Sequence, residues 1–152
     1  MINIKESIHQ IGEYEIFSSE KGYLGKFKNR IMDVALNAMA NILIGTSTDL
    51  IIKYLAIGAS NTAITDSDIK LGNEVFRTPK LSLFNYAVGS IQSDFIILDS
   101  DYAGTIQEIG IFASATATST KDSGILISRI LWNYSKTSTE ELNFRRTDRV
   151  VR

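Results

Sequence analysis

The sequence predicts a mainly β protein, an antiparallel β-sandwich with one N-terminal α-helix packed on it. The composition favours strands joined by turns, because β-branched residues, Ser, Thr and Asn are abundant and Pro79 is the only proline. The pattern along the chain agrees with this class. One stretch repeats its apolar residues at helical spacing, and about seven or eight short apolar runs separated by turn residues follow it.

Length and charge limit the possible organisation and partners. A chain of 152 residues suits a single domain over residues 1–152, large enough to fold without a disulfide or a metal. It contains no cysteine, which excludes thiolate metal sites and cysteine nucleophiles. A net charge of −1 predicts no general attraction to nucleic acid or to an anionic membrane. With no long apolar run and no signal-peptide pattern at the N-terminus, we expect a soluble protein made in a cytoplasm.

The first 12 residues are expected to form an arm. Ile2 and Ile4 alternate with polar residues, so this arm is suited to adding a strand to a neighbouring subunit. Packing of the same tail on its own domain is an equal alternative. Residues 13–45 are then expected to hold a strand at 13–17 and the helix, and residues 46–152 the β-sandwich.

The helix is predicted over about residues 26–43, and Gly45 just past its end suits a left-handed cap. Lys26, Lys28 and Arg30 then lie near its start, the unfavourable end of the macrodipole for a cation. One interpretation is that these charges contact a partner. The other, that they are simply solvated, is favoured because such dipole effects are only about 0.3–1 kcal/mol. The apolar residues at helical spacing are Ile31, Ala35, Ala38, Met39 and Ile42.

The strands are expected to follow one another to the C-terminus. The run at 50–57 alternates little, which indicates a strand buried on both faces. Pro79 removes a backbone donor, so it predicts a strand end or a sheet edge. The other strands are expected at residues 75–77, 81–88, 95–98, 105–113, 125–134 and 141–152.

Two long loops interrupt these strands. The first runs from Gly58 to Gly72 as a long ordered loop, and either glycine can take a positive φ to turn the chain. The second, at residues 114–124, is rich in Ser, Thr and Ala and is expected to be a mobile tip.

Four charged residues in or beside apolar strands predict ion pairs. Glu108 and Arg129 lie in strands joined by the second loop, so a hairpin would bring them together, and Glu74 and Arg77 flank the first loop. A buried carboxylate must be paired, because an isolated buried charge is too costly. We therefore predict a Glu–Arg network that fixes the first loop to the sandwich. The alternative is a set of surface pairs worth about 0–1 kcal/mol.

The residues needed for catalysis are scarce. His9 is the only histidine, so no triad and no histidine metal cluster can form. The acids at 94–108 could act as a glycosidase pair, and Asp99/Asp101 or Asp66/Asp68 could bind calcium. Such residues in turns more often cap backbone amides. We expect a non-enzyme with no cofactor and no metal site.

The C-terminal residues 144–152 contain four arginines. A basic tail can bind nucleic acid. These arginines are interleaved with Phe144, Val150 and Val151, which suits a strand with one charged face. Arginine is also enriched at protein interfaces, so an interface is preferred over nucleic acid.

Four segments, in order, carry a resemblance to a known class of protein. They are IGASNTAITDSDIKLGNEVFR at residues 57–77, IQEIGIF at 106–112, SGILISR at 123–129, and Lys136 followed by Thr137, Glu141 and Leu142. Over about residues 50–145 the chain resembles small structural proteins of tailed bacteriophages, which belong to baseplates, tail fibres and collars. Ile64 stands where that class frequently has a proline.

The resemblance implies a structural component of the virion tail, at the baseplate or the point of fibre attachment, with a neck or collar position as the alternative. Such proteins assemble in rings or trimers with other virion proteins, after synthesis in the host bacterial cytoplasm. A carbohydrate-binding sandwich that recognises a host surface is the second class, and exposed Tyr86 or Tyr102 would support it. The expected assembly contacts are Ile2, Ile4, Lys26, Lys28, Arg30, Arg145, Arg146, Arg149 and Arg152.

Overall fold

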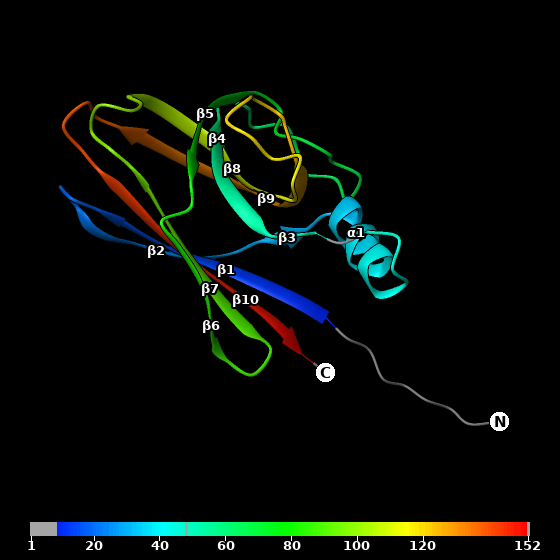
Figure 1. The fold of residues 1–152 in the computed structure, drawn as a ribbon. Helices are drawn as coiled ribbons and strands as arrows, with labels where there is room; N and C mark the ends of the chain where they lie inside the picture. The colour runs from blue at the N-terminus through cyan, green and yellow to red at the C-terminus, as the bar shows by residue number, and fades with distance from the viewer. Residues whose placement is uncertain (1–8, 48, 152) are drawn as a thin grey trace.

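The computed structural model describes residues 9–47 and 49–151, and these form the predicted β-sandwich with one helix (Figure 1). All paired strands are antiparallel. The first sheet, sheet A, has the order β2 (Gly22–Lys28), β1 (His9–Ser18), β10 (Leu142–Val151), β7 (Ser90–Ile97) and β6 (Ser82–Ala87). The second, sheet B, has the order β3 (Arg30–Ile31), β9 (Ile125–Lys136), β8 (Gly104–Ala113), β4 (Ile52–Gly58) and β5 (Glu74–Pro79).

The main core lies between the two sheets. Alternate residues of each strand point inward, so Ile16 on β1 and Phe144 on β10 face Leu55 on β4 and Ile109 on β8. Trp132 on β9 joins this core, with its ring stacked on Tyr134 at a centroid distance of 4.7 Å. Period-two burial on both sheets is what makes the two layers pack face to face.

A second, smaller core covers the outer face of sheet B. It contains Met32, Ala56, Leu71, Phe112, Ala117 and Leu126. Leu71 comes from the loop after β4, and Ala117 comes from the loop between β8 and β9, so both long loops fold over this face. This explains why the run at 50–57 alternates so little. As predicted, β4 is buried on both faces, with Leu55 and Ile57 inward and Ala56 outward.

The helix is shorter than predicted. Helix α1 spans Asp33–Leu43, whereas Lys26 and Lys28 lie in β2 and Arg30 lies in β3. Phe27 explains the error, because it points inward opposite Tyr14 and packs on Trp132 while its two lysine neighbours point out. The side chains of this segment therefore alternate with the two-residue period of a strand. Because these cations lie on strands and not at the start of a helix, the macrodipole argument does not apply to them.

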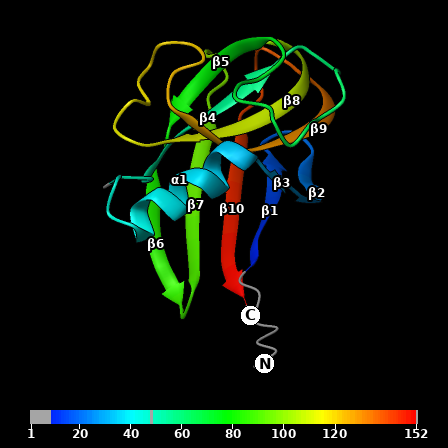
Figure 2. The ribbon, with the colours of Figure 1, turned by 90° about the vertical axis from the view of Figure 1, so that its right-hand side faces the viewer.

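The end of α1 agrees with the prediction. Gly45 has φ = +78°, and its N–H donates to the carbonyl of Ile42 while the N–H of Thr46 donates to that of Asn41. These two bonds form a Schellman motif, which needs a left-handed residue after the helix. Figures 1 and 2 show α1 at one end of the sandwich, where the two sheets diverge.

The predicted division of the chain at residue 46 is wrong. β1 and β2 belong to sheet A and β3 belongs to sheet B, so the segment before the helix is part of the sandwich. Residues 9–12 of the expected arm are the start of β1, paired with 148–151 of β10, and residues 1–8 lie outside the described part. No helix in the described ranges is long and apolar enough to cross a membrane.

Candidate functional site

The predicted pair of Glu108 and Arg129 forms on the outer face of sheet B. Nε of Arg129 lies 2.7 Å from Oε2 of Glu108, and both side chains are almost fully buried. The two strands place them diagonally, since Arg129 is opposite Gly110 and Glu108 is opposite Leu131. A buried pair with such close geometry needs further hydrogen bonds to offset the loss of water.

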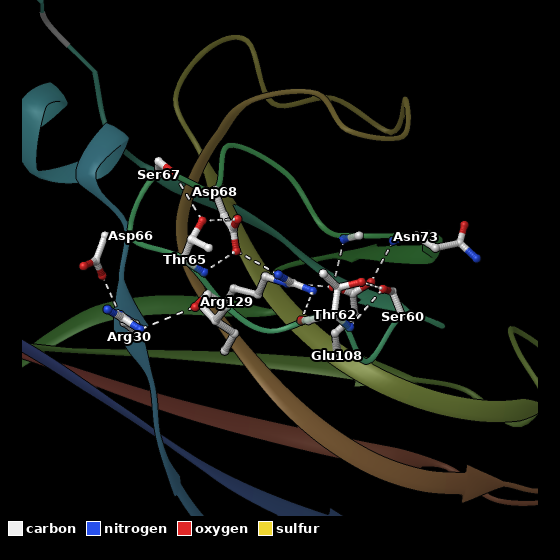
Figure 3. Close-up of polar contacts among 12 residues, drawn as sticks. Arg30, Ser60, Thr62, Thr65, Asp66, Ser67, Asp68, Asn73, Glu108 and Arg129 are labelled. Carbon is white, nitrogen blue, oxygen red and sulfur yellow. Dashed lines mark hydrogen bonds and ion pairs between the residues drawn. The ribbon is translucent and has the colours of Figure 1, made fainter.

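The first long loop supplies those hydrogen bonds (Figure 3). The backbone N–H groups of Gly72 and Asn73 donate to the two oxygens of Glu108, at 2.9 and 2.8 Å. Arg129 donates to the carbonyl of Thr62 at 3.0 Å and to Oδ2 of Asp68 at 2.8 Å. The pair therefore fixes both halves of the loop to the sheet, as the sequence suggested.

Asp68 adds a second charge to this cluster. Partial burial opposes its charged form, but hydrogen bonds from Thr65 and Arg129 outweigh that effect and hold the pKa of Asp68 below its usual value. Thr65 contributes both its hydroxyl and its N–H. Arg30 on β3 pairs with Asp66 of the same loop, and the N–H of Asp33 donates to the Asp66 carbonyl. The loop is thus also tied to the start of α1.

Gly58 and Gly72 serve a different purpose from the one predicted. Neither is among the glycines with positive φ. A Cβ at Gly58 would instead collide with the carboxylate of Glu108 and with the carbonyl of Asn73, and a Cβ at Gly72 would collide with Ser60. These positions need glycine because the loop backbone approaches the buried charge closely.

The pair of Glu74 and Arg77 fastens the second long loop. Nη2 of Arg77 lies 2.8 Å from Oε2 of Glu74, and the guanidinium lies 4.6 Å from the centroid of the Phe112 ring. Arg77 also donates to the carbonyls of Thr118 and Ser123, while Glu74 accepts from the N–H of Asp122. The loop expected to be a mobile tip is therefore tied to the sheet. The sequence placed this pair beside the first loop, but it holds the second.

Arg146 is not a surface contact, contrary to the prediction. Its side chain is fully buried between the sheets and makes two hydrogen bonds to Asp148, at 2.8 and 2.6 Å. It also donates to the hydroxyls of Tyr14 and Ser128. Burial raises the pKa of the Tyr14 hydroxyl although the cation beside it acts in the opposite direction. Leu142, Phe144, Arg146 and Asp148 share one strand face, so strict alternation from Phe144 could have revealed this.

A further buried carboxylate, Glu140, was missed from the sequence. Its carboxylate accepts hydrogen bonds from the hydroxyls of Ser18 and Tyr134 and from the N–H of Thr137. Burial opposes its charged form, but these hydrogen bonds outweigh it and hold the pKa of Glu140 below its usual value. It joins the β1–β2 turn to the β9–β10 turn. A glutamate in a polar turn gave no sequence signal for this role.

The remaining predicted contacts divide between one face and the undescribed ends. Lys26, Lys28, Arg145 and Arg149 all point from the outer face of sheet A, where Glu13 accepts from Lys26 and Arg149. Arg145 pairs with Asp94 on the same face. Partial burial opposes the charged form of Asp94, but its hydrogen-bond donors outweigh that effect and hold its pKa below the usual value. Ile2, Ile4 and Arg152 lie outside the described residues.

The acids at residues 94–101 make hydrogen bonds within their own turn or sheet. Asp99 and Asp101 each accept a backbone N–H in their own turn, as expected of capping residues. Asp94 bonds to Ser82, Gln92 and Arg145. Among residues 9–47 and 49–151, no three His, Cys, Asp or Glu side chains are placed to hold a metal ion. The arrangement can fasten loops and join strands, and every polar group described above does so.

The chain was compared with protein-family models, curated proteins and solved structures, and nothing matched.

Proposed function

We propose that this protein is a structural component of a tailed-phage virion, located in the tail at the baseplate or fibre attachment, with the neck or collar as the alternative place. It acts through contacts with copies of itself and with other virion proteins. One observation carries the proposal. Residues from three of the four resembling segments, Thr62 and Asp68 from the first, Glu108 from the second and Arg129 from the third, converge on one cluster that fastens a loop.

This use of polar residues suits an assembly protein. The charged side chains of sheet B hold two long loops in fixed positions over its outer face. A surface that is ordered before it meets a partner loses less conformational entropy on binding. Rigid loops are therefore a favourable way to present contacts in a particle.

The outer face of sheet A offers the charges for a second contact. Lys26, Lys28, Arg145 and Arg149 alternate there with Glu13 and Asp94. A field of mixed sign adds little affinity by itself, but it sets the register and orientation of a partner that carries the complementary pattern. Four of the contact residues expected from the sequence thus share one surface.

A carbohydrate-binding sandwich remains the second candidate because of two exposed aromatic rings. Phe84 and Tyr86 both lie on the edge strand β6, and each is nearly half exposed. Tyr102 is a weaker candidate, since it is half-buried and its hydroxyl donates to the carbonyl of Thr105. A glycan-binding screen addresses this candidate directly.

The test is the mass of the purified chain in solution, by light scattering over a range of concentrations, with electron cryo-microscopy of any ring. We expect a defined ring or trimer, whose symmetry would indicate its place in the particle. A chain that stays monomeric at every concentration and binds a glycan would overturn the proposal in favour of the second candidate.

A further inference from the structure

An apolar groove lies at the end of the sandwich next to α1. It has a volume of about 480 Å³ and is walled by α1, the start of β4, the β6–β7 hairpin and the last residues of β10. Its apolar lining includes Met39, Ile51, Ile52, Phe84, Ile91 and Val150. Ile52 and Ile91 belong to or pack against the main core, so the groove is an opening into the space between the sheets.

The side chains at its mouth are unusually exposed for apolar residues. Ile51 is 53% exposed and Val150 is 55% exposed. Leu43 and Ile44 at the end of α1, and Val88 at the tip of the hairpin, are more exposed still. Exposed apolar side chains on the elements that wall an apolar groove indicate an interaction site.

We propose that this groove binds residues 1–8 of a second copy of the chain. The inference rests on the proposed assembly function and names one of its contacts. The sequence of the segment is MINIKESI, in which Ile2 and Ile4 alternate with polar residues and suit an extended strand with one apolar side.

The start of β1, to which this segment is joined, lies close to the groove. His9 pairs with Val151, which follows the groove residue Val150, and the N–H of Val150 donates to the carbonyl of Gly89 in the β6–β7 turn. Eight extended residues span at most about 26–29 Å. That length is enough to reach from one subunit into the matching groove of a neighbour packed end to end.

The groove also offers backbone pairing. One of its walls is β6, the edge strand of sheet A, whose outer edge has no strand beside it among the described residues. An extended segment can add to such an edge, with main-chain hydrogen bonds for affinity and pockets for alternate side chains. Ile2 and Ile4 would then enter the apolar part of the groove.

Two observations favour a second copy over the chain's own segment. Residues 1–8 contain neither glycine nor proline, the residues that most readily reverse a chain that would otherwise continue the line of β1. Leu43, Ile44 and Val88 are also exposed and do not line the groove, and the body of a neighbouring copy would cover them, which a short segment of the same chain would not. Exchange between two copies would fill both grooves by one symmetric contact.

The experiment uses the absence of cysteine from the chain. A full-length Ile4→Cys chain is mixed with a full-length Ile51→Cys chain of different tag length and treated with a short bismaleimide. We expect a mixed two-chain product. The control replaces the second chain with Leu98→Cys, which is 40% exposed just after the end of β7 that lies away from the groove and should give none. If a single chain that carries both Ile4→Cys and Ile51→Cys is cross-linked within itself as a monomer, the segment binds the groove of its own chain and the exchange is overturned.

A second measurement separates this inference from the proposed function. Ile51→Glu should raise the concentration needed for assembly at least tenfold, whereas Leu98→Glu should leave it unchanged, with the fold of each variant checked by thermal unfolding. If the wild-type chain assembles, Ile51→Glu assembles equally well and no mixed product forms, the groove inference is wrong and the proposed function stands. A wild-type chain that never assembles would overturn the groove inference, and it would overturn the proposed function as well if the chain also binds a glycan.

Discussion

Arg129 and Glu108 meet diagonally across β8 and β9, with Gly110 directly opposite the arginine. A Cβ at Gly110 would meet Leu71 of the overlying loop and Leu126 of β9, so the missing side chain lets the loop descend onto the pair. The backbone of the first loop and leucine side chains therefore cover the ion pair. Its stability and the position of the loop depend on each other.

Arg129→Met should destabilise the protein by about 3–5 kcal/mol, because it leaves the Glu108 carboxylate buried without its cation. The loop should also become more sensitive to proteolysis between Thr62 and Gly72, since its carbonyl contact at Thr62 is lost. Urea unfolding and limited proteolysis measure the two effects.

Arg145→Met is the matched control for that variant. It removes the same kind of pair, with Asp94, from a half-exposed position on sheet A. Exposed pairs contribute only about 0–1 kcal/mol. If the two variants lost equal stability, the buried position of Arg129 would not be the reason for its effect.

Gly58→Ala should destabilise the protein by about 1–3 kcal/mol through steric strain, although the φ angle of Gly58 suits any residue. The new methyl would displace the Glu108 carboxylate from the N–H groups of Gly72 and Asn73. Urea unfolding gives the loss of stability, and amide hydrogen exchange at 72 and 73 should show faster exchange. Exchange as slow as in the wild type would contradict the close-approach explanation.

Arg146→Leu should destabilise the protein by about 3–5 kcal/mol, because it removes a buried cation that pairs with Asp148 and donates to Tyr14 and Ser128. The variant should lower the stability of the fold itself, and it should not act by removing a contact between subunits. Arg149→Leu, on the outer face of the same strand, is the control and should keep wild-type thermal stability. Thermal unfolding of both variants checks this, and equal stability would contradict the structural role of Arg146.

The sequence alone was enough to predict the sandwich, the order of the later strands along the chain and the Glu108–Arg129 contact. Those depend on local alternation and on a hairpin between neighbouring strands. It failed over residues 26–31, where Phe27 packs on Trp132 more than 100 positions away and sets a strand period inside a stretch of good helix formers. Tertiary packing overrode local preference there.

The same limit explains the charged residues that were misplaced. Arg146 follows Arg145 in a tail with four arginines, which hid the alternation that places it inward with Phe144, and one of its partners there is Tyr14 on a distant strand. Glu140 is held by Ser18 and Tyr134 from two other segments. Contacts between residues far apart in the sequence decide such cases, and a single sequence does not contain them.

Glu140→Gln should reduce the dependence of stability on acid pH. The pKa of Glu140 is lowered in the folded protein from the ordinary value of 4.5, so its carboxylate stabilises the fold fully above about pH 4.5. That contribution is lost as the pH falls through the lower, folded pKa. The variant should lose about 1–3 kcal/mol at pH 7, from weaker hydrogen bonds with Ser18 and Tyr134, and less at pH 3.

Urea unfolding of wild type and Glu140→Gln at pH 7 and pH 3 measures this difference. Glu141→Gln makes the same charge change one residue away and serves as the control. The gap in stability between wild type and Glu140→Gln should narrow on acidification, because the wild-type carboxylate becomes protonated and the two side chains are then both neutral. If the difference in stability between wild type and Glu140→Gln is equal at both pH values, the negative charge of Glu140 does not contribute to joining the two turns.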